Sequence, residues 1–489
     1  MPFRQFLPAL LFAAALHAEV RVAQLLTDHM VVQQNMPVHV WGSASPGESV
    51  DVAFRTDTRN TVTDNAGRWS VWFPPVPEPG GPHEINIRSG AKTIRLRDVL
   101  VGEVWIAAGQ SNMEWPVAWA ANPDTEKQAA NYPQIRLVRT MHRVRDYPQD
   151  DFVGTAWEPA TPHSVEKFSA VGYHFARMIH QHRKVPIGII QSAWGGTPAE
   201  AWTSLRGLSS SASLMPVFEE WGRVADAHDT ALRRHRYRLD DWVRKGSKGD
   251  RPELRTGPGG PWTPTGLFNG MLAPITKLPI QGVIWYQGES NTSPERAPVY
   301  EHLFPAMIRD WRRAWSQGDF PFLFVQLANF NAAPDSMWPE VRDAQRQALG
   351  VTNTAMAVTI DAGTPDDIHP RNKRIVADRL FRAARALVYN EPIVPAGPLF
   401  RQATIEGAQL RLRFDNAGGL VLRSSAGFEL AGENGKWFTA TPRLEGATVL
   451  VSAPEVPEPR YVRYAWADNP PSTLYNAEGL PASPFRTRR

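Results

Sequence analysis

Short apolar runs alternate with amphipathic stretches through the middle of the chain, and this alternation constrains the fold more than any other feature. Five runs are apolar enough to be strands buried on both faces: 101–108, 187–190, 282–286, 322–325 and 356–360. The stretches between them, such as 170–182 and 371–388, repeat apolar residues at helical spacing. Buried strands that alternate with helices predict an α/β domain with a doubly wound sheet.

Both ends of the chain have the pattern of separate β domains. Residues 19–97 contain short, partly alternating runs such as 38–41 and 50–54, separated by turn residues. Strand patterns return after residue 393. For a chain of 489 residues more than one domain is expected. We predict an N-terminal β-sandwich at 19–97, an α/β domain at 98–392 and a C-terminal β domain at 393–489.

Residues 209–262 interrupt the alternation and are predicted to be an insertion over one end of the sheet. Within them, residues 226–248 are dense in Arg, Asp and His and have the pattern of a solvated helix. The net charge of the whole chain is +4, without a sustained basic run. We therefore expect a solvated surface and no nucleic-acid partner.

The first 18 residues have the pattern of a secretory signal peptide. Arg4 precedes an apolar run over residues 6–15, and Ala18 offers a small residue for cleavage before Glu19. The run is too short to span a bilayer, and no later segment is longer, so no membrane partner is expected. The chain has no cysteine. These features predict export to a periplasm or to the exterior; the alternative is a buried N-terminal element.

Four polar blocks come directly after predicted strands or before a predicted helix, at positions where ligands bind in doubly wound sheets. They are residues 109–116, 191–197, 285–291 and 366–370. In the first block, Gly109 permits a tight turn and Ser111 directs its hydroxyl into the crevice beside free backbone N–H groups. Because Met113 stands where a nucleophile elbow has glycine, the block is not Gly-x-Ser-x-Gly.

The other three blocks offer partners for a serine nucleophile, each with an alternative role. The glycines at 195 and 196 let the backbone approach a ligand or simply form a turn. Gln287 carries amide donors for an oxyanion, and Glu289 is either catalytic or a structural acid. His369 follows an aspartate by the spacing of an oriented base, although that aspartate could instead cap a helix. His180 and His182 lack a nearby third ligand, so no metal is expected there.

In this order, the four blocks resemble the sialate O-acetylesterase family, a branch of the SGNH hydrolases. The resemblance rests on Gly-Gln-Ser-Asn-Met-Glu-Trp at 109–115, Gly-Gly-Thr-Pro at 195–198, Trp-Tyr-Gln-Gly-Glu-Ser-Asn at 285–291 and Asp-Ile-His-Pro at 367–370. It implies a flavodoxin-like, three-layer hydrolase domain with all-β accessory domains and no cofactor. It also implies hydrolysis of acetyl esters on sugars.

The same resemblance assigns roles to the residues of the blocks. Ser111 matches the nucleophile, His369 the base and Gly196 an oxyanion donor. Asp366 matches the acid of the Asp-x-x-His pattern, with the adjacent Asp367 as the alternative. Because residues 288–291 depart from the Gly-x-Asn-Asp of the wider superfamily, the third donor is expected to be Gln287, with Asn291 as second choice.

The expected substrate is an acetylated glycan, either xyloglucan or xylan, or 9-O-acetyl sialic acid. Tryptophans near the predicted loops favour a neutral glycan: Trp115, Trp119, Trp194, Trp202 and Trp262. A sialic acid would need an arginine near the pocket, for which Arg206 and Arg255 are candidates. Two further alternatives are a metal-dependent deacetylase and a catalytically inactive carbohydrate-binding protein.

Overall fold

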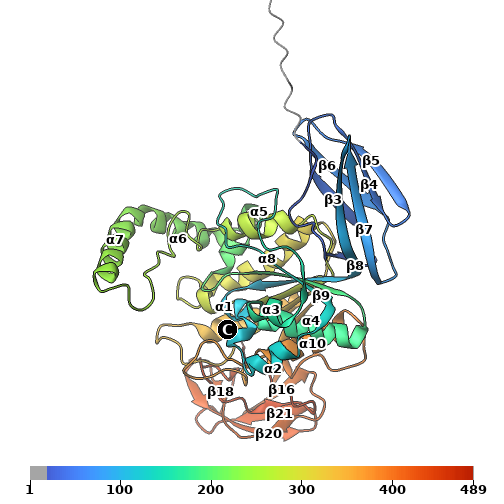
Figure 1. Cartoon of the computed structure of the whole chain (residues 1–489). Helices are drawn as coiled ribbons and strands as arrows, with labels where there is room; N and C mark the ends of the chain where they lie inside the picture. The colour runs from blue at the N-terminus through green and yellow to red at the C-terminus, as the bar shows by residue number, and fades with distance from the viewer. Residues whose placement is uncertain (1–18, 488–489) are drawn as a thin grey trace, which may run out of the picture.

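The computed structural model describes residues 19–487, which form a central α/β region flanked by two β regions (Figure 1). The predicted signal peptide at 1–18 lies outside the described residues. Among residues 19–487, no helix combines the length and apolar character needed to cross a membrane.

The N-terminal region consists of two packed β-sheets. One contains β1 (Arg21–Val22), β3 (Val38–Ser43) and β6 (Arg68–Phe73). The other contains β2 (Val31–Gln33), β4 (Ser49–Phe54), β5 (Asp57–Val62), β7 (Gly80–Ser89) and the first part of β8 (Lys92–Gly109). Strand β6 alternates exposed and buried residues, as a strand with one solvated face does. Pro82 lies at the irregular end of β7, where its register with β8 shifts.

Strand β8 connects the N-terminal region directly to the central one. Its first half pairs with β7, and its second half pairs with β11 and β12 of the central sheet. The predicted domain boundary between residues 97 and 98 therefore falls inside a continuous strand, where no linker separates the two regions.

The central sheet has the order β10-β9-β11-β8-β12-β13-β14. Its strands besides β8 are β9 (Tyr132–Arg139), β10 (Glu158–Ala160), β11 (Ile187–Ala193), β12 (Gly282–Tyr286), β13 (Phe322–Val325) and β14 (Thr354–Ala357). All are parallel except β10 at one edge. Since β11 and β12 lie on opposite sides of β8, the strand order reverses at β8. The crevice beyond its carboxyl end is thus the expected ligand site.

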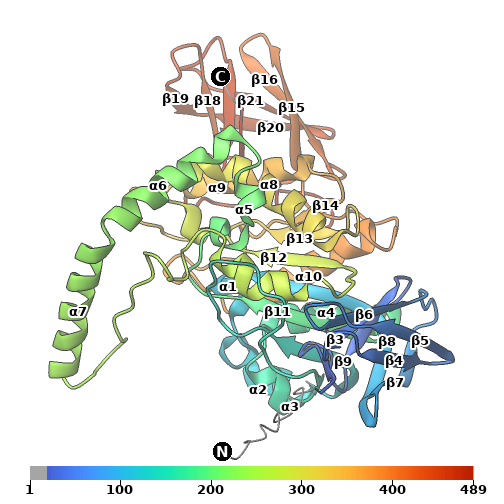
Figure 2. The same ribbon diagram turned by 90° about the horizontal axis from the view of Figure 1, so that it is seen from above.

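Helices cover both faces of this sheet, which confirms the three-layer α/β architecture (Figure 2). On one face, α4 (Ala170–Arg183) packs beside α10 (Lys373–Leu387), and the ring of Phe175 contacts Trp105 of β8 edge-to-face at 5.0 Å. On the other face lie α8 (Ala297–Trp315) and α9 (Trp338–Gln347). The shorter helices are α1 (Ser111–Glu114), α2 (Pro123–Gln128), α3 (Pro162–Glu166) and α5 (Leu205–Leu208).

The C-terminal region is all-β, as predicted. Its first sheet contains β15 (Leu399–Glu406), β16 (Gln409–Asp415), β20 (Thr441–Glu445) and β21 (Thr448–Ser452). Its second contains β18 (Phe428–Ala431), β19 (Trp437–Thr439), β22 (Tyr461–Tyr464) and β24 (Phe485–Arg486). A further pair consists of β17 (Val421–Leu422) and β23 (Leu474–Tyr475). The buried Arg342 of α9 donates hydrogen bonds to the carbonyls of Ala467 and Asp468, which fixes this region to the central one.

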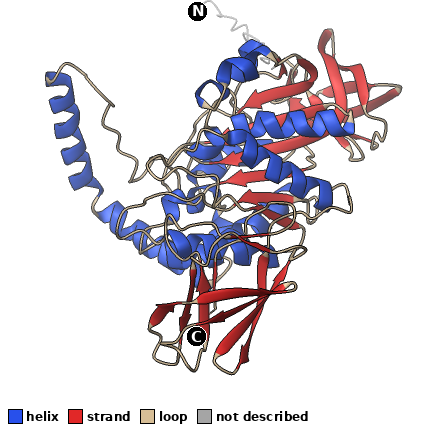
Figure 3. Cartoon of the chain, turned by 90° about the horizontal axis from the view of Figure 1, so that it is seen from below, coloured by secondary structure: helices blue, strands red, loops and turns tan. Residues whose placement is uncertain are grey.

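The insertion forms two helices, and the second projects away from the body of the molecule (Figure 3). These are α6 (Met215–Asp226) and α7 (His228–Arg244). Helix α7 has no buried residue, which agrees with the solvated helix predicted for 226–248.

Candidate active site

The turn after β8 places Ser111 at the point where the strand order reverses. Gly109 has φ of 141°, and a Cβ atom there would lie 2.1 Å from the carbonyl oxygen of Tyr286, so only glycine fits. The N–H of Gln110 donates to the same carbonyl at 3.0 Å. Ser111 then begins α1, which leaves its own N–H without a helical acceptor.

His369 lies directly against Ser111, although 258 residues separate them in the chain. Its Nε2 atom is 2.8 Å from Ser111 Oγ. The imidazole ring stacks on Trp115 with a centroid distance of 4.6 Å, which fixes the plane of the ring. The structure thus brings together the nucleophile and the base that the sequence predicts, in the geometry of a serine and its general base.

The aspartates before His369 are arranged differently from the prediction. Asp366 is exposed, and its carboxylate accepts a hydrogen bond from Asn331 at 3.3 Å. Asp367 instead accepts the backbone N–H of His369 at 2.8 Å, and its charge acts on the imidazole. The geometry therefore favours Asp367 over Asp366 as the acid that acts on His369, because the turn directs the Asp366 side chain outward.

Gly195 and Gly196, which follow β11, form a turn beside Ser111. A Cβ atom on Gly195 would lie 3.3 Å from the Cβ of Ser111, so this turn approaches the nucleophile closely. The N–H of Gly195 donates to Glu114 Oε2 at 2.6 Å and is not free for a substrate. Gly196, with φ of 68°, has an N–H with no acceptor among residues 19–487, which leaves it available as an oxyanion donor.

Both of the predicted third donors are buried and hydrogen-bonded to neighbouring groups. Gln287 is fully buried, and its Nε2 donates to the carbonyl of Thr197 at 3.3 Å and to Asn291 Oδ1 at 2.7 Å. The Nδ2 atom of Asn291 donates to Glu200 at 2.9 Å. Both side chains therefore brace the loop under the glycine turn, and the prediction of an oxyanion role for Gln287 does not fit this geometry.

Asn112, which the sequence analysis did not single out, connects the nucleophile to the base. Its Nδ2 donates to the carbonyl of Ile368 at 3.0 Å and to Glu289 Oε1 at 2.6 Å. Its Oδ1 accepts a hydrogen bond from Lys373 Nζ. The amide thus holds the residue after Ser111 against the residue before His369. The only signal in the sequence was that a polar residue directly follows Ser111.

The side chains of Lys373 and Glu289, which both contact the Asn112 amide, are buried charged groups. Burial lowers the pKa of Lys373 to about 7, although Glu289 and Asp367 oppose the change. Burial also raises the pKa of Glu289, whose Oε2 atom has no partner. The pKa of His369 is lowered first by its burial and then by the charge of Lys373, with Asp367 acting in the opposite direction. His369 is therefore kept neutral, as a general base must be.

We expect kcat/KM to rise with pH as His369 loses its proton, through a pKa below the ordinary 6.5. Replacement of Lys373 by methionine removes a charge that lowers this pKa, so the acidic limb of the profile should move to higher pH. The profile of kcat/KM against pH measures this shift. Lys92→Met, in the N-terminal region, is the matched control. An acidic limb that stays in place in Lys373→Met would contradict the assignment.

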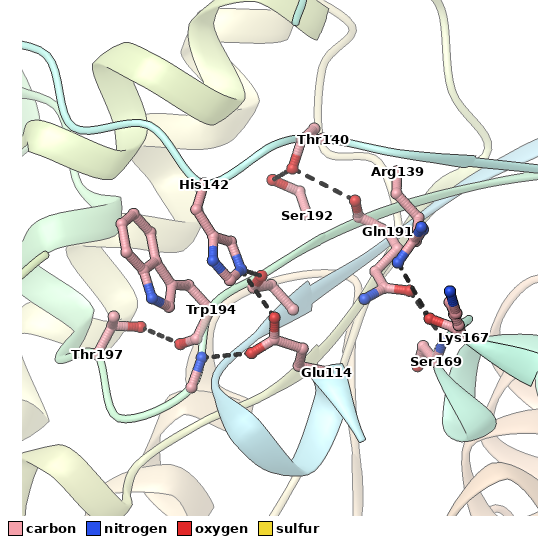
Figure 4. A network of polar contacts seen from close by, with 12 residues as sticks. Glu114, Arg139, Thr140, His142, Lys167, Ser169, Gln191, Ser192, Trp194 and Thr197 are labelled. Atoms are coloured by element: carbon pink, nitrogen blue, oxygen red, sulfur yellow. Dashed lines mark hydrogen bonds and ion pairs between the residues drawn. The ribbon is translucent and has the colours of Figure 1, made fainter. Parts of the chain in front are cut away.

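A cavity of about 610 Å³ opens in front of Ser111 and His369. Trp115 and the exposed Trp119 line one part of it. Arg139, Lys167 and Gln191 line another part, and Figure 4 shows these three side chains grouped together, with Arg139 donating to the carbonyl of Lys167 at 3.2 Å. Neither Arg139 nor Lys167 forms an ion pair within the described chain, so both charges are available to a ligand.

The other aromatic and basic candidates lie outside this cavity. Trp202 is buried in the core against Trp285. Trp194 stacks on His142, and Trp262 donates to the carbonyl of Gly196 at 2.7 Å, so both support the glycine turn. Arg255 donates to the carbonyl of Gly195 at 2.9 Å, and Arg206 is exposed on α5; neither lines the cavity.

Comparison with known proteins shows the family of the chain. A family model described as "Carbohydrate esterase, sialic acid-specific acetylesterase" matches residues 101–221 and 261–380. The human sialate O-acetylesterase is 30% identical, over 95% of this chain and 92% of its own length. The chain belongs to the sialic acid-specific acetylesterase family. It is thus a carbohydrate acetylesterase, a carboxylic ester hydrolase.

Two further proteins are similar to this chain over nearly their whole length. The rat sialate O-acetylesterase is 29% identical, over 96% of this chain and 94% of its own. The crystal structure of a carbohydrate acetylesterase from Xanthomonas citri superposes with a TM-score of 0.83 at 36% identity, covering 96% of this chain and 100% of that one. The family resemblance predicted from the four blocks is therefore confirmed.

The part of this acetylesterase that the family model matches contains the whole candidate site. It includes Ser111, Gly196 and His369 but omits residues 222–260. Between residues 19 and 487, no group of three or more His, Cys, Asp or Glu side chains is arranged to hold a metal ion.

Proposed function

We propose that this carbohydrate acetylesterase works through a covalent acetyl-enzyme on Ser111. The observation that carries the proposal is the 2.8 Å contact between Ser111 Oγ and His369 Nε2 at the base of the cavity. A neutral imidazole at that distance can accept the hydroxyl proton as the oxygen attacks. The lowered pKa of His369 keeps the imidazole in that state near neutral pH.

In the first half-reaction, Ser111 Oγ bonds to the acetyl carbonyl carbon while its proton passes to His369 Nε2. The N–H groups of Ser111 and Gly196 donate to the oxyanion that develops, and each such donor is typically worth about 3 kcal/mol of barrier. The charge of Asp367 stabilises the imidazolium. The carbon–oxygen bond to the sugar then breaks, and the leaving oxygen takes the proton from His369.

In the second half-reaction, water replaces the sugar. His369 accepts a proton from that water as it attacks the acetyl carbonyl, and Ser111 Oγ leaves with the proton that His369 returns. The products are acetate, the deacetylated sugar and the free enzyme, so no redox partner or cofactor enters the cycle.

Two classes of acetylated sugar are candidates for the cavity. Trp115 and Trp119 could stack on the rings of a neutral glycan such as xyloglucan or xylan. Arg139 and Lys167 favour a sugar that carries a carboxylate, such as 9-O-acetyl sialic acid, because each cation lacks a protein partner. We propose the acidic sugar as the better substrate, because both cations line the cavity whereas only two of the five tryptophans that favoured the neutral glycan do.

Acetate release from 9-O-acetyl sialic acid, acetylated xylan and acetylated xyloglucan tests this proposal. With Arg139→Gln, kcat/KM for the acidic sugar should fall about tenfold or more, since a charged hydrogen bond is lost. The two neutral glycans should be affected about twofold at most, and Arg206→Gln should change none of the three. Faster release from the neutral glycans by the unmodified protein would assign them as substrates instead.

A further inference from the structure

Within the region that the family model matches, residues 222–260 of the insertion are the segment that it leaves out. We call residues 222–255 the basic arm. It consists of the end of α6, the whole of α7 and a return segment, and it projects away from the body in Figures 2 and 3. In proteins most of the stability of a helix comes from packing of an apolar face, and α7 buries no residue. Such an exposed helix is suited to a partner that covers it.

The basic arm carries the excess charge of the whole protein. Residues 222–255 contain ten basic and six acidic side chains, a net charge of +4, which equals the formal net charge of the whole chain. The rest of the chain is therefore neutral overall. A second copy of the protein offers no net negative surface for the arm, whereas an anionic polymer does.

Much of the positive charge of the basic arm belongs to a group of arginines on α7. Arg233, Arg234, Arg236 and Arg238 are exposed and form no ion pair within residues 19–487. Three of them line a hollow of about 690 Å³ between α7 and the return segment; its lining residues include Arg233, Arg234, Tyr237, Arg238, Leu254 and Thr256. Guanidinium groups beside an exposed tyrosine suit a sugar ring that bears carboxylates.

Both ends of the basic arm are attached beside the catalytic turn. Where the return segment ends, Arg255 donates to the carbonyl of Gly195 at 2.9 Å. On the α6 side, Glu220 pairs with Arg296, whose guanidinium lies 4.4 Å from the ring centre of Trp262. Trp262 in turn donates to the carbonyl of Gly196. A polymer held along the arm would therefore lie on the same side of the molecule as Ser111.

We propose that the basic arm binds an anionic polysaccharide and holds it next to the catalytic cavity. The evidence that the arm binds an anion is the group of arginines alone. The choice of a polysaccharide over a nucleic acid rests on the proposed carbohydrate substrate of the esterase. Because exposed charges are screened within about 10 Å in 0.1 M salt and about 3 Å in 1 M salt, the binding should weaken steeply as salt increases.

Binding of polygalacturonate, a carboxylated polymer without acetyl groups, tests the proposal by calorimetry on the full chain. The variant is Arg233→Gln with Arg234→Gln and Arg238→Gln, since glutamine keeps nearly the helix propensity of arginine. The control carries Arg401→Gln, Arg413→Gln and Arg460→Gln, three exposed arginines in the C-terminal region. We expect the arm variant to weaken Kd about tenfold or more and the control about twofold at most.

Four outcomes would overturn the proposal: unchanged binding by the arm variant, equal binding of neutral dextran, tighter binding of duplex DNA than of polygalacturonate, or a dimer that the arm variant dissociates. Hydrolysis of 4-nitrophenyl acetate, measured in parallel, should be the same in all three proteins. A lack of hydrolysis would contradict the proposed function without affecting the binding result, so the two proposals fail separately.

Discussion

Replacement of Ser111 by alanine is expected to lower the turnover of 4-nitrophenyl acetate by about 10³-fold or more. The hydroxyl is the only group positioned to attack within reach of His369 Nε2 in the described chain. The free energy of unfolding should change by only about 0.5 kcal/mol, because the side chain makes no other hydrogen bond in the structure. Initial rates and urea unfolding of the variant measure the two effects.

The matched control is Ser290→Ala, in the loop of the third polar block. Its hydroxyl makes no hydrogen bond to His369, so turnover should stay within about threefold of the unmodified protein. Retained turnover in Ser111→Ala, or an equal loss in Ser290→Ala, would show that Ser111 is not the nucleophile.

Replacement of Asn112 by alanine is expected to damage both stability and catalysis. It removes the partner of Lys373 and of Glu289, two buried charged groups, and should lower the free energy of unfolding by about 3 kcal/mol. It also releases Ile368 from the nucleophile turn, so kcat/KM should fall about 100-fold as the contact between Ser111 and His369 loosens. Urea unfolding and steady-state kinetics measure these changes.

Asn131→Ala, at an exposed position, should change stability by about 0.5 kcal/mol at most. Adding Glu289→Gln and Lys373→Met to the Asn112 variant should recover part of the lost stability, because no buried charge then remains without a partner. If Asn112→Ala unfolds at the same urea concentration as the unmodified protein, the amide does not brace the site.

Much of the fold could be predicted because the hydrophobic pattern is a local property of the chain. The runs at 187–190 and 282–286 became β11 and β12, since a parallel sheet covered on both faces requires continuous apolar strands. The boundary at residue 97 was misplaced because β8 serves two sheets. The apolar run of β8 begins at Val99, before pairing with β11 starts at Glu103, so only pairing in three dimensions shows where one sheet ends.

The pairing of Ser111 with His369 could be predicted because each residue has a short, specific setting, with Ser111 after a buried strand and His369 after paired aspartates. The supporting residues could not, since the partner of a polar side chain depends on tertiary contacts. Spacing favoured Asp366, but the local turn directs it to Asn331. The position of Gln287 in the third polar block favoured it as a donor, but its amide donates to Thr197 and Asn291 inside the core.

Labelling with diethyl 4-nitrophenyl phosphate, which phosphorylates activated serines, tests the role of Ser111 as covalent nucleophile most directly. Intact-protein mass and peptide mapping give the number and position of the adducts. We predict one diethylphosphoryl group per chain, on Ser111, and a loss of esterase activity in proportion to its formation. An adduct on another serine in the inactivated protein, or full activity in protein fully modified at Ser111, would contradict the assignment.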